Sequence, residues 1–157
     1  FRIGISNVKN HYDQLRKSYK EAKDVLTIKK RKNCRTLFYE ELGVYRVLLE
    51  QNSQNVMEEF IDDYIGPLLK YDEETNGNLL LTLSTYLRCM GSKKETAEAL
   101  YIVRQTLYHR LDKIKELLGE DYMHARKRQA IELAIAAHLM NTGKFDDGVH
   151  GDRFSVL

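Results

Sequence analysis

The segment Gly91 to Leu118 constrains the fold most, because its pattern is typical of two short helices joined by a tight turn. Ser92 followed by Glu95 has the spacing of a capping box, in which a hydroxyl and a carboxylate satisfy free N–H groups at a helix start. A short helix over 95–100 is expected next, and Tyr101 and Ile102 then turn the chain. Apolar residues follow at 103, 107, 111, 114 and 118, the spacing of a one-faced helix. The sequence therefore predicts a helix-turn-helix.

The predicted second helix, Val103–Leu118, directs polar and basic side chains away from its apolar face. They crowd the N-terminal half of the helix, where such helices meet the major groove of DNA. Arg suits guanine and Gln suits adenine, so Arg104 and Gln105 are the first candidates for base contacts, and Thr106 is the candidate for a phosphate contact. The full candidate DNA-binding set is Ser92, Thr96, Arg104, Gln105, Thr106, Tyr108, His109 and Arg110. Arg110 has a second interpretation, an ion pair with Glu95 or Glu98 that holds the helix in place.

Other classes of protein remain open at this point. Short helices with tight turns also occur in bundles that only mediate oligomerisation or bind a protein partner, and a basic helix face is often simply solvated. An enzyme is disfavoured, because local sequence suggests no catalytic Ser/His/Asp or Cys/His set and no glycine-rich phosphate loop. Cys34 and Cys89 share no metal-like spacing with each other or with a histidine, so no metal and no cofactor are expected.

The particular residues of 79–140 favour DNA binding. They are Leu80, Thr82, Leu83, Tyr86, Leu87, Gly91, Glu95, Thr96, Ala97, Leu100, Arg104, Thr106, Leu107, Tyr108, Arg110, Leu111, Ile114, Leu117, Leu118 and Gly119. With them the segment resembles the C-terminal helix-turn-helix of PucR/CdaR-type bacterial transcriptional regulators. The sequence departs from that pattern at Lys94, where serine is usual, at Gln105, where asparagine is usual, and at His109, where an aromatic is usual. The resemblance implies a cytoplasmic, sequence-specific regulator that binds operator DNA as a homodimer or higher oligomer, with its effector sensed upstream.

The N-terminal part reads as a strand at Phe1–Ser6, a helix at Tyr12–Lys30 and a second strand at Arg35–Phe38. The helix is expected to be apolar along Leu15, Tyr19, Ala22 and Leu26. Two strands alone expose too much edge to be stable, so this part is predicted to be the remnant of a truncated α/β domain. It is similar to the end of the degenerate GGDEF-like domain that precedes the helix-turn-helix in these regulators.

Two further helices, Glu40–Gln51 and Val56–Ile65, are expected to form a connector, with Gly66-Pro67 ending the second and an acidic linker following. Charge is uneven: 9–35 holds ten basic and three acidic residues, and 40–74 holds ten acidic and two basic ones. These blocks either contact each other or are solvated. Leu79–Met90 is the expected first helix of the DNA-binding unit. The alanine-rich Tyr122–Met140 is expected to be buried in the core or against a partner subunit.

The predicted fold class is mainly α. Its predicted parts are a GGDEF-like α/β remnant at 1–50, a helical connector and linker at 51–76, a helix-turn-helix domain at 77–140 and a disordered tail at 141–157. No run approaches the roughly 18–20 apolar residues that a membrane span needs.

Overall fold

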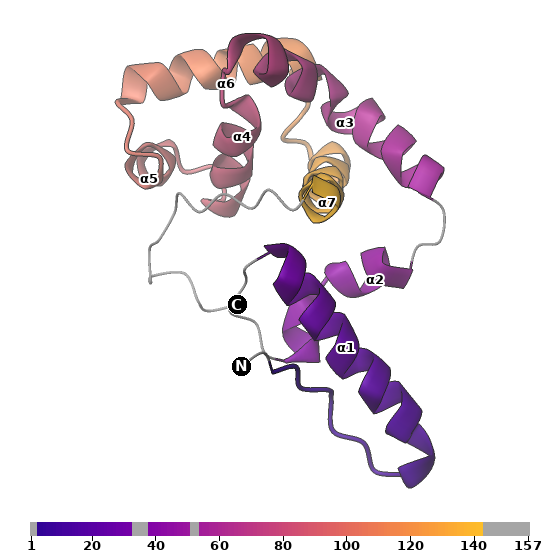
Figure 1. The fold of residues 1–157 in the computed structure, drawn as a ribbon. Helices are drawn as coiled ribbons and strands as arrows, with labels where there is room; N and C mark the ends of the chain where they lie inside the picture. The colour runs from indigo at the N-terminus through magenta and orange to yellow at the C-terminus, as the bar shows by residue number, and fades with distance from the viewer. Residues whose placement is uncertain (1–2, 33–37, 51–53, 143–157) are drawn as a thin grey trace. The chain divides into compact units, whose positions relative to one another are not determined.

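The structure is a computed structural model that describes residues 3–32, 38–50 and 54–142, and within these ranges it is helical with no strand. The chain divides into two compact units (Figure 1). The first contains residues up to Asn55 together with the end, from Ala136, of the last helix, α7 (Ala125–Thr142), and the second contains Val56–Ile135. The mainly α fold class is thus confirmed. The predicted tail from 143 onward lies outside the described residues.

The first unit consists of η1 (Tyr12–Gln14), α1 (Leu15–Lys32), η2 (Tyr39–Leu42) and α2 (Tyr45–Glu50). Ile5 and Phe38 form a parallel β-bridge, and the Tyr39 N–H donates to the Ile5 carbonyl at 2.8 Å. The predicted strands lie partly outside the described residues. The described part has a single bridge in place of a ladder, so the truncated α/β domain is not seen there.

The N-terminal segment lies directly against α1. A Cβ at Gly4 would lie 2.4 Å from the Ala22 carbonyl oxygen, so only glycine allows this approach. The buried side of α1 carries Glu21, Val25 and Ile28, and not the predicted stripe. That expectation was wrong: Leu15 and Tyr19 are 66% and 71% exposed.

Helices are present in both predicted connector segments, but their predicted bounds were wrong. The expected helix Glu40–Gln51 is divided at Gly43, whose φ of 52° is left-handed, so η2 and α2 are separate. The expected stop at Gly66-Pro67 is absent, because α3 (Gln54–Thr75) continues through Pro67. Gly66 has no Cβ to clash with the proline ring, and Ile65 and Leu68 are fully buried on either side of Gly66-Pro67. Packing therefore outweighs the lost backbone hydrogen bond.

The two charge blocks contact each other within the first unit. Lys20 of α1 forms an ion pair with Glu50 of α2, and both side chains are more than half exposed. An exposed pair of this kind contributes little to stability, about 0–1 kcal/mol.

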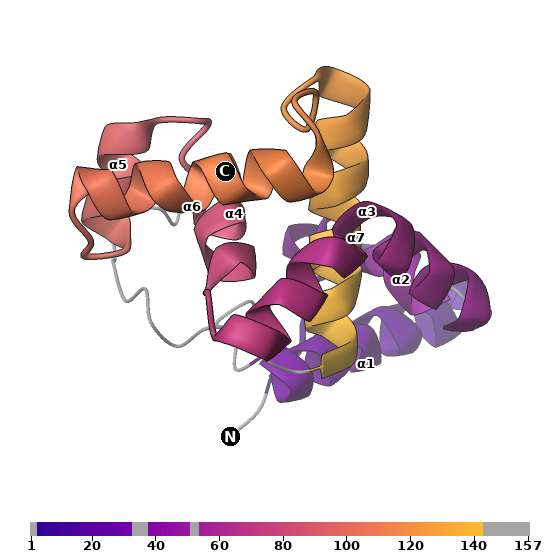
Figure 2. The same cartoon turned by 90° about the horizontal axis from the view of Figure 1, so that it is seen from above.

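The second unit holds α3, α4 (Leu79–Arg88), α5 (Lys93–Ala99), α6 (Arg104–Leu118) and the first part of α7 (Ala125–Thr142). Figures 1 and 2 show α6 lying across α4 and α5, and the three helices contact one another pairwise. Their shared core contains Leu83 of α4, Ala97 of α5 and Leu107 of α6. The predicted helix-turn-helix is confirmed, with bounds within two residues of those expected.

Candidate nucleic-acid interface

The start of α4 is fixed by an acidic residue of the preceding helix. The two oxygens of the Asp72 carboxylate accept the N–H groups of Leu79 and Leu80 at 2.7 and 2.8 Å. These N–H groups belong to the first turn of α4, where a negative charge is favourable. Asp72 was treated in the sequence as part of a solvated acidic linker, and its role depends on a contact that spacing alone does not reveal.

The start of α5 is capped by Ser92, whose hydroxyl oxygen accepts the Glu95 N–H at 3.4 Å. The return bond of a full capping box is not formed, because the Ser92 N–H donates to the Cys89 carbonyl at 2.9 Å. Thr96 is fully buried, and its hydroxyl donates to the Ser92 carbonyl at 2.7 Å. Thr96 is therefore closed to a ligand, contrary to its place in the predicted DNA-binding set. Ser92 contributes to the start of α5 as a cap.

The turn between α5 and α6 is a Schellman motif. The N–H of Ile102 donates to the Ala97 carbonyl at 3.0 Å, and the N–H of Tyr101 donates to the Glu98 carbonyl at 3.2 Å. Tyr101 takes the left-handed position, with φ 52°, which glycine usually occupies. This turn closes α5 and sets the point at which α6 begins.

The faces of α6 follow from burial. Leu107, Leu111, Ile114 and Leu118 are buried and form its inner stripe, as predicted. Val103, which was predicted to share this stripe, precedes the helix and is 69% exposed. Gln105 and His109 are exposed and one turn apart, on the side opposite the stripe. The same outer side carries Asp112 and Glu116 further along the helix. Only the N-terminal half of α6 therefore presents an outer face without carboxylates.

Arg110 lies on the flank of α6 that faces α4. Its guanidinium donates to the hydroxyl of Thr82 at 3.2 Å, and that hydroxyl donates to the Asn78 carbonyl at 2.7 Å. The expected partners, Glu95 and Glu98, form no such bond with Arg110 within the described residues. Arg110 is thus a positioning residue that fixes the rotation of α6 against α4. Thr106 is half-buried on the same flank.

The opposite flank of α6 faces α5. Arg104 and Tyr108 lie one turn apart on it, and the Lys93 ammonium of α5 lies 4.3 Å from the centre of the Tyr108 ring. Lys93 was absent from the sequence candidates, because a contact between two helices leaves no signal in the spacing of either one. A lysine at the start of a predicted first helix could have been singled out only by assuming how the two helices pack.

Charge is neutralised unevenly over the second unit. Among the described residues, Lys113, Lys115, Lys127 and Arg128 pair with Glu116, Glu120, Asp121 and Glu132 at 2.6–3.0 Å. Lys93, Lys94 and Arg104 are exposed, and none of them has a carboxylate partner in the described part of the chain. The beginnings of α5 and α6 therefore carry positive charge that is available to an external anion.

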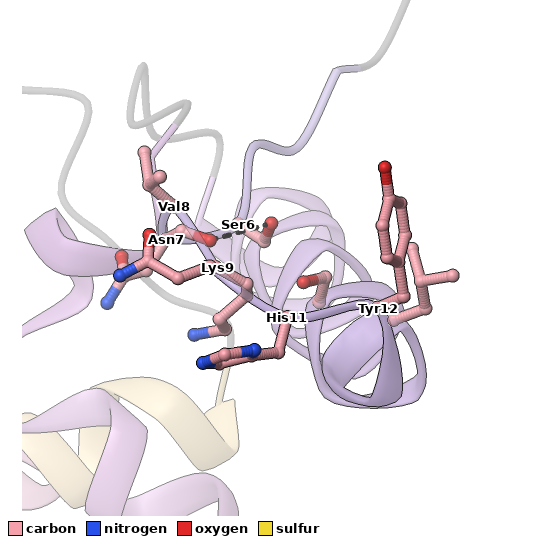
Figure 3. A pocket seen from close by; sticks show the side chains of 9 residues that line it. Ser6, Asn7, Val8, Lys9, His11 and Tyr12 are labelled. Carbon is pink, nitrogen blue, oxygen red and sulfur yellow. Dashed lines mark hydrogen bonds between the residues drawn. The ribbon is translucent and has the colours of Figure 1, made fainter.

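A polar hollow of about 450 Å³ lies elsewhere, along Ser6 to Tyr12 of the first unit (Figure 3). Its lysine, Lys9, forms an ion pair with the buried Glu21 at 2.7 Å. Burial alone would raise the pKa of Glu21, but the hydrogen bonds from Lys9 and from the Asn7 N–H outweigh it and lower that pKa below its ordinary value. The charge of Lys9 is therefore already compensated, and the hollow is a weaker candidate for binding an anion.

No group of three or more His, Cys, Asp or Glu side chains in the described residues could hold a metal ion. No helix there is both long enough and apolar enough to cross a lipid bilayer.

Three packed helices, with a tight turn before the third and uncompensated cations at its start, define the class of helix-turn-helix DNA-binding domains. Residues 79–137 match the PucR C-terminal helix-turn-helix domain. Residues 79–137 therefore form a helix-turn-helix domain of the PucR C-terminal type.

Curated relatives agree with this assignment. The chain is 36% identical over 136 residues to the proline-responsive transcriptional activator PutR of Bacillus subtilis, an alignment that covers 85% of the chain and 33% of PutR. It is 28% identical over 138 residues to the carbohydrate diacid regulator of Escherichia coli, covering 86% of the chain and 35% of that regulator. It is 33% identical over 79 residues to the purine catabolism regulatory protein of Bacillus subtilis, covering 50% and 15%. The chain thus spans about a third of the length of the first two relatives. No solved structure shows a significant match.

Proposed function

We propose that this chain is the DNA-binding part of a bacterial transcriptional regulator, and that the N-terminal half of α6 reads base pairs in a major groove. The observation that carries the proposal is the N-terminal half of α6, a helix end free of carboxylates. Exposed Gln105 and His109 lie there on the outer face, and exposed Arg104 lies on the adjoining flank. The match of 79–137 to the PucR C-terminal domain supports the same use of this surface.

Within this proposal the side chains divide into two groups. Arg104 and Gln105 read bases, because Arg pairs bidentately with guanine and Gln with adenine, and His109 follows one turn later. Thr106 and the free N–H groups of the first turn of α6 contact phosphate, because α6 has no side-chain cap and a helix N-terminus attracts an anion. Tyr108 lies on the same flank as Arg104, and Arg110 fixes the rotation of the helix through its bond to Thr82.

The proposed regulator is a homodimer or higher oligomer in the cytoplasm, and it is not an enzyme. A single helix-turn-helix buries limited surface on DNA, so specific binding needs two copies on repeated half-sites. We also propose that a small effector is sensed by a part of the regulator outside these residues. PutR, of which the chain spans a third, is described as proline-responsive.

Selection of bound duplexes from a random DNA library tests the proposal. The parent chain should enrich one motif, and its affinity for that duplex should fall steeply from 50 to 200 mM salt, since phosphate contacts release counterions. Arg104→Glu should abolish the enrichment. Arg126→Glu reverses an equally exposed charge at the start of α7 and should retain it.

A parent chain that enriches nothing and retains no DNA at low salt would contradict the proposal. The alternative, a helical module for oligomerisation or protein binding, predicts that outcome.

A further inference from the structure

The contact between Lys93 and Tyr108 joins the two helices of the helix-turn-helix at their exposed side. Lys93 is the first residue of α5, and Tyr108 lies in the N-terminal half of α6, 45% exposed. The Lys93 ammonium lies 4.3 Å from the ring centre, within the distance at which a cation is attracted to an aromatic face. A ring occupies one side of an ammonium and leaves its remaining N–H groups free to donate.

Lys93 differs in its partner from three lysines of the second unit that form ion pairs. Lys113, Lys115 and Lys127 each contact a carboxylate, which cancels their charge. The Tyr108 ring carries no charge, so it orients Lys93 without neutralising it. A cation that is held in place and not compensated loses less entropy when it meets an anion.

The anion that fits this place is a DNA phosphate. Arg104 lies one turn before Tyr108 on the same flank of α6, so two exposed cations without carboxylate partners, Lys93 and Arg104, belong to this side of the helix-turn-helix. A helix in the major groove has a phosphate strand along each flank. Lys93 of α5 lies beside the flank of α6 that faces α5, through its contact with Tyr108.

We propose that Lys93, held by the ring of Tyr108, is a DNA-backbone contact that fixes how α6 enters the groove. This inference rests on the proposed function and adds a role for Lys93 and Tyr108. Lys93 supplies charge to a phosphate and Tyr108 supplies position, so neither selects a base.

The salt dependence of binding to a random-sequence duplex tests this role, because a phosphate contact acts on every sequence. For the full chain, the slope of log K against log salt should become shallower by about 1 in Lys93→Gln, with binding about fivefold weaker at 0.15 M salt. Lys93→Arg keeps both the charge and the contact with the ring, so it should retain the parent slope.

Substitutions at Tyr108 test the role of its ring, and a substitution at Lys115 serves as the control for loss of charge. Tyr108→Phe keeps the ring and should retain most of the slope, whereas Tyr108→Leu should behave like Lys93→Gln. Lys115→Gln removes the same unit of charge from a lysine paired with Glu120 at 3.0 Å, and should leave the slope unchanged. Thermal melting of every variant checks that the domain stays folded.

The two proposals fail in different ways. A parent chain that does not bind duplex DNA contradicts the proposed function itself. A parent chain that binds with a steep slope, while folded Lys93→Gln keeps that slope, overturns only the role of Lys93. A slope that Lys115→Gln lowers as much as Lys93→Gln does would mean that net charge alone governs binding, which also overturns it.

Discussion

Tyr101 and Met90 have the left-handed backbone that non-glycine residues avoid. Their φ angles are 52° and 53°, and each follows a helix that ends in paired Schellman hydrogen bonds. Such a conformation costs a residue with a Cβ about 1–2 kcal/mol. Their side chains are 85% and 76% exposed, so little packing offsets this cost. The two turns that frame α5 therefore hold local strain that the rest of the unit overcomes.

Tyr101→Gly should stabilise the chain by about 1 kcal/mol, because glycine adopts the left-handed conformation without a Cβ clash. Chemical denaturation of parent and variant measures the difference. Glu98→Gly provides the control: Glu98 is exposed inside α5, where glycine should destabilise by about 0.5–1 kcal/mol. A Tyr101→Gly variant less stable than the parent would show that the tyrosine side chain makes contacts worth more than the strain.

At the scale of the elements, α6 has one buried stripe and two flanks, and each flank contacts a different helix. Arg110 binds α4 through Thr82, and Tyr108 binds α5 through Lys93. The stripe supplies most of the stabilisation, since Leu107 and Ile114 are fully buried. The rotation of α6, and with it the face shown to DNA, depends on all three contacts.

Leu111→Ala should destabilise the second unit by about 2–5 kcal/mol, because it removes a large side chain that is 5% exposed and leaves a cavity. Denaturant unfolding followed by circular dichroism measures the change. Asp112→Ala alters the exposed neighbour and should change stability by less than about 0.5 kcal/mol. An unchanged unfolding curve for Leu111→Ala would mean that α6 is rotated from the position described.

Elements with local signals were predictable, and elements defined by distant contacts were not. The cap at Ser92 and the apolar period of α6 are local, and both identify helices whose observed bounds differ by two residues or fewer. Two neighbouring faces of α1 both carry apolar residues. Which of them is buried therefore depends on the segments that pack against the helix. The inner face includes Glu21, whose burial is tolerated because Lys9 and the Asn7 N–H contact it.

In the candidate site, too, features set by local sequence were predictable and features set by packing between helices were not. The exposed positions of α6 follow from helical period, so Arg104, Gln105 and His109 were identified from sequence alone. The burial of Thr96 and the bond from Arg110 to Thr82 depend on helix packing, as does the position of Lys93. Spacing within one helix carries no information about them.

Over the whole molecule, the local distribution of charge is more informative than the net charge. The chain has a formal net charge of only +2 at pH 7, which does not by itself suggest a nucleic-acid partner. Within the second unit, carboxylates pair with Lys113 and Lys115 in the C-terminal half of α6 and with Lys127 and Arg128 of α7. The cations at the starts of α5 and α6 have no such partner among the described residues. This local asymmetry directs the proposed contact with DNA to one end of the reading helix.

The claim that α6 reads sequence is tested most directly by four affinities at one salt concentration: Arg104→Ala and Thr106→Val, each on the selected duplex and on a scrambled one. Arg104→Ala should weaken binding to the selected duplex by about 1–3 kcal/mol and reduce its preference over the scrambled duplex. Thr106→Val should weaken both duplexes about equally, since a phosphate contact carries no base information. If Arg104→Ala weakens both alike, Arg104 binds phosphate and not a base. If neither variant changes the affinity of a duplex that the parent binds, α6 is not the reading surface.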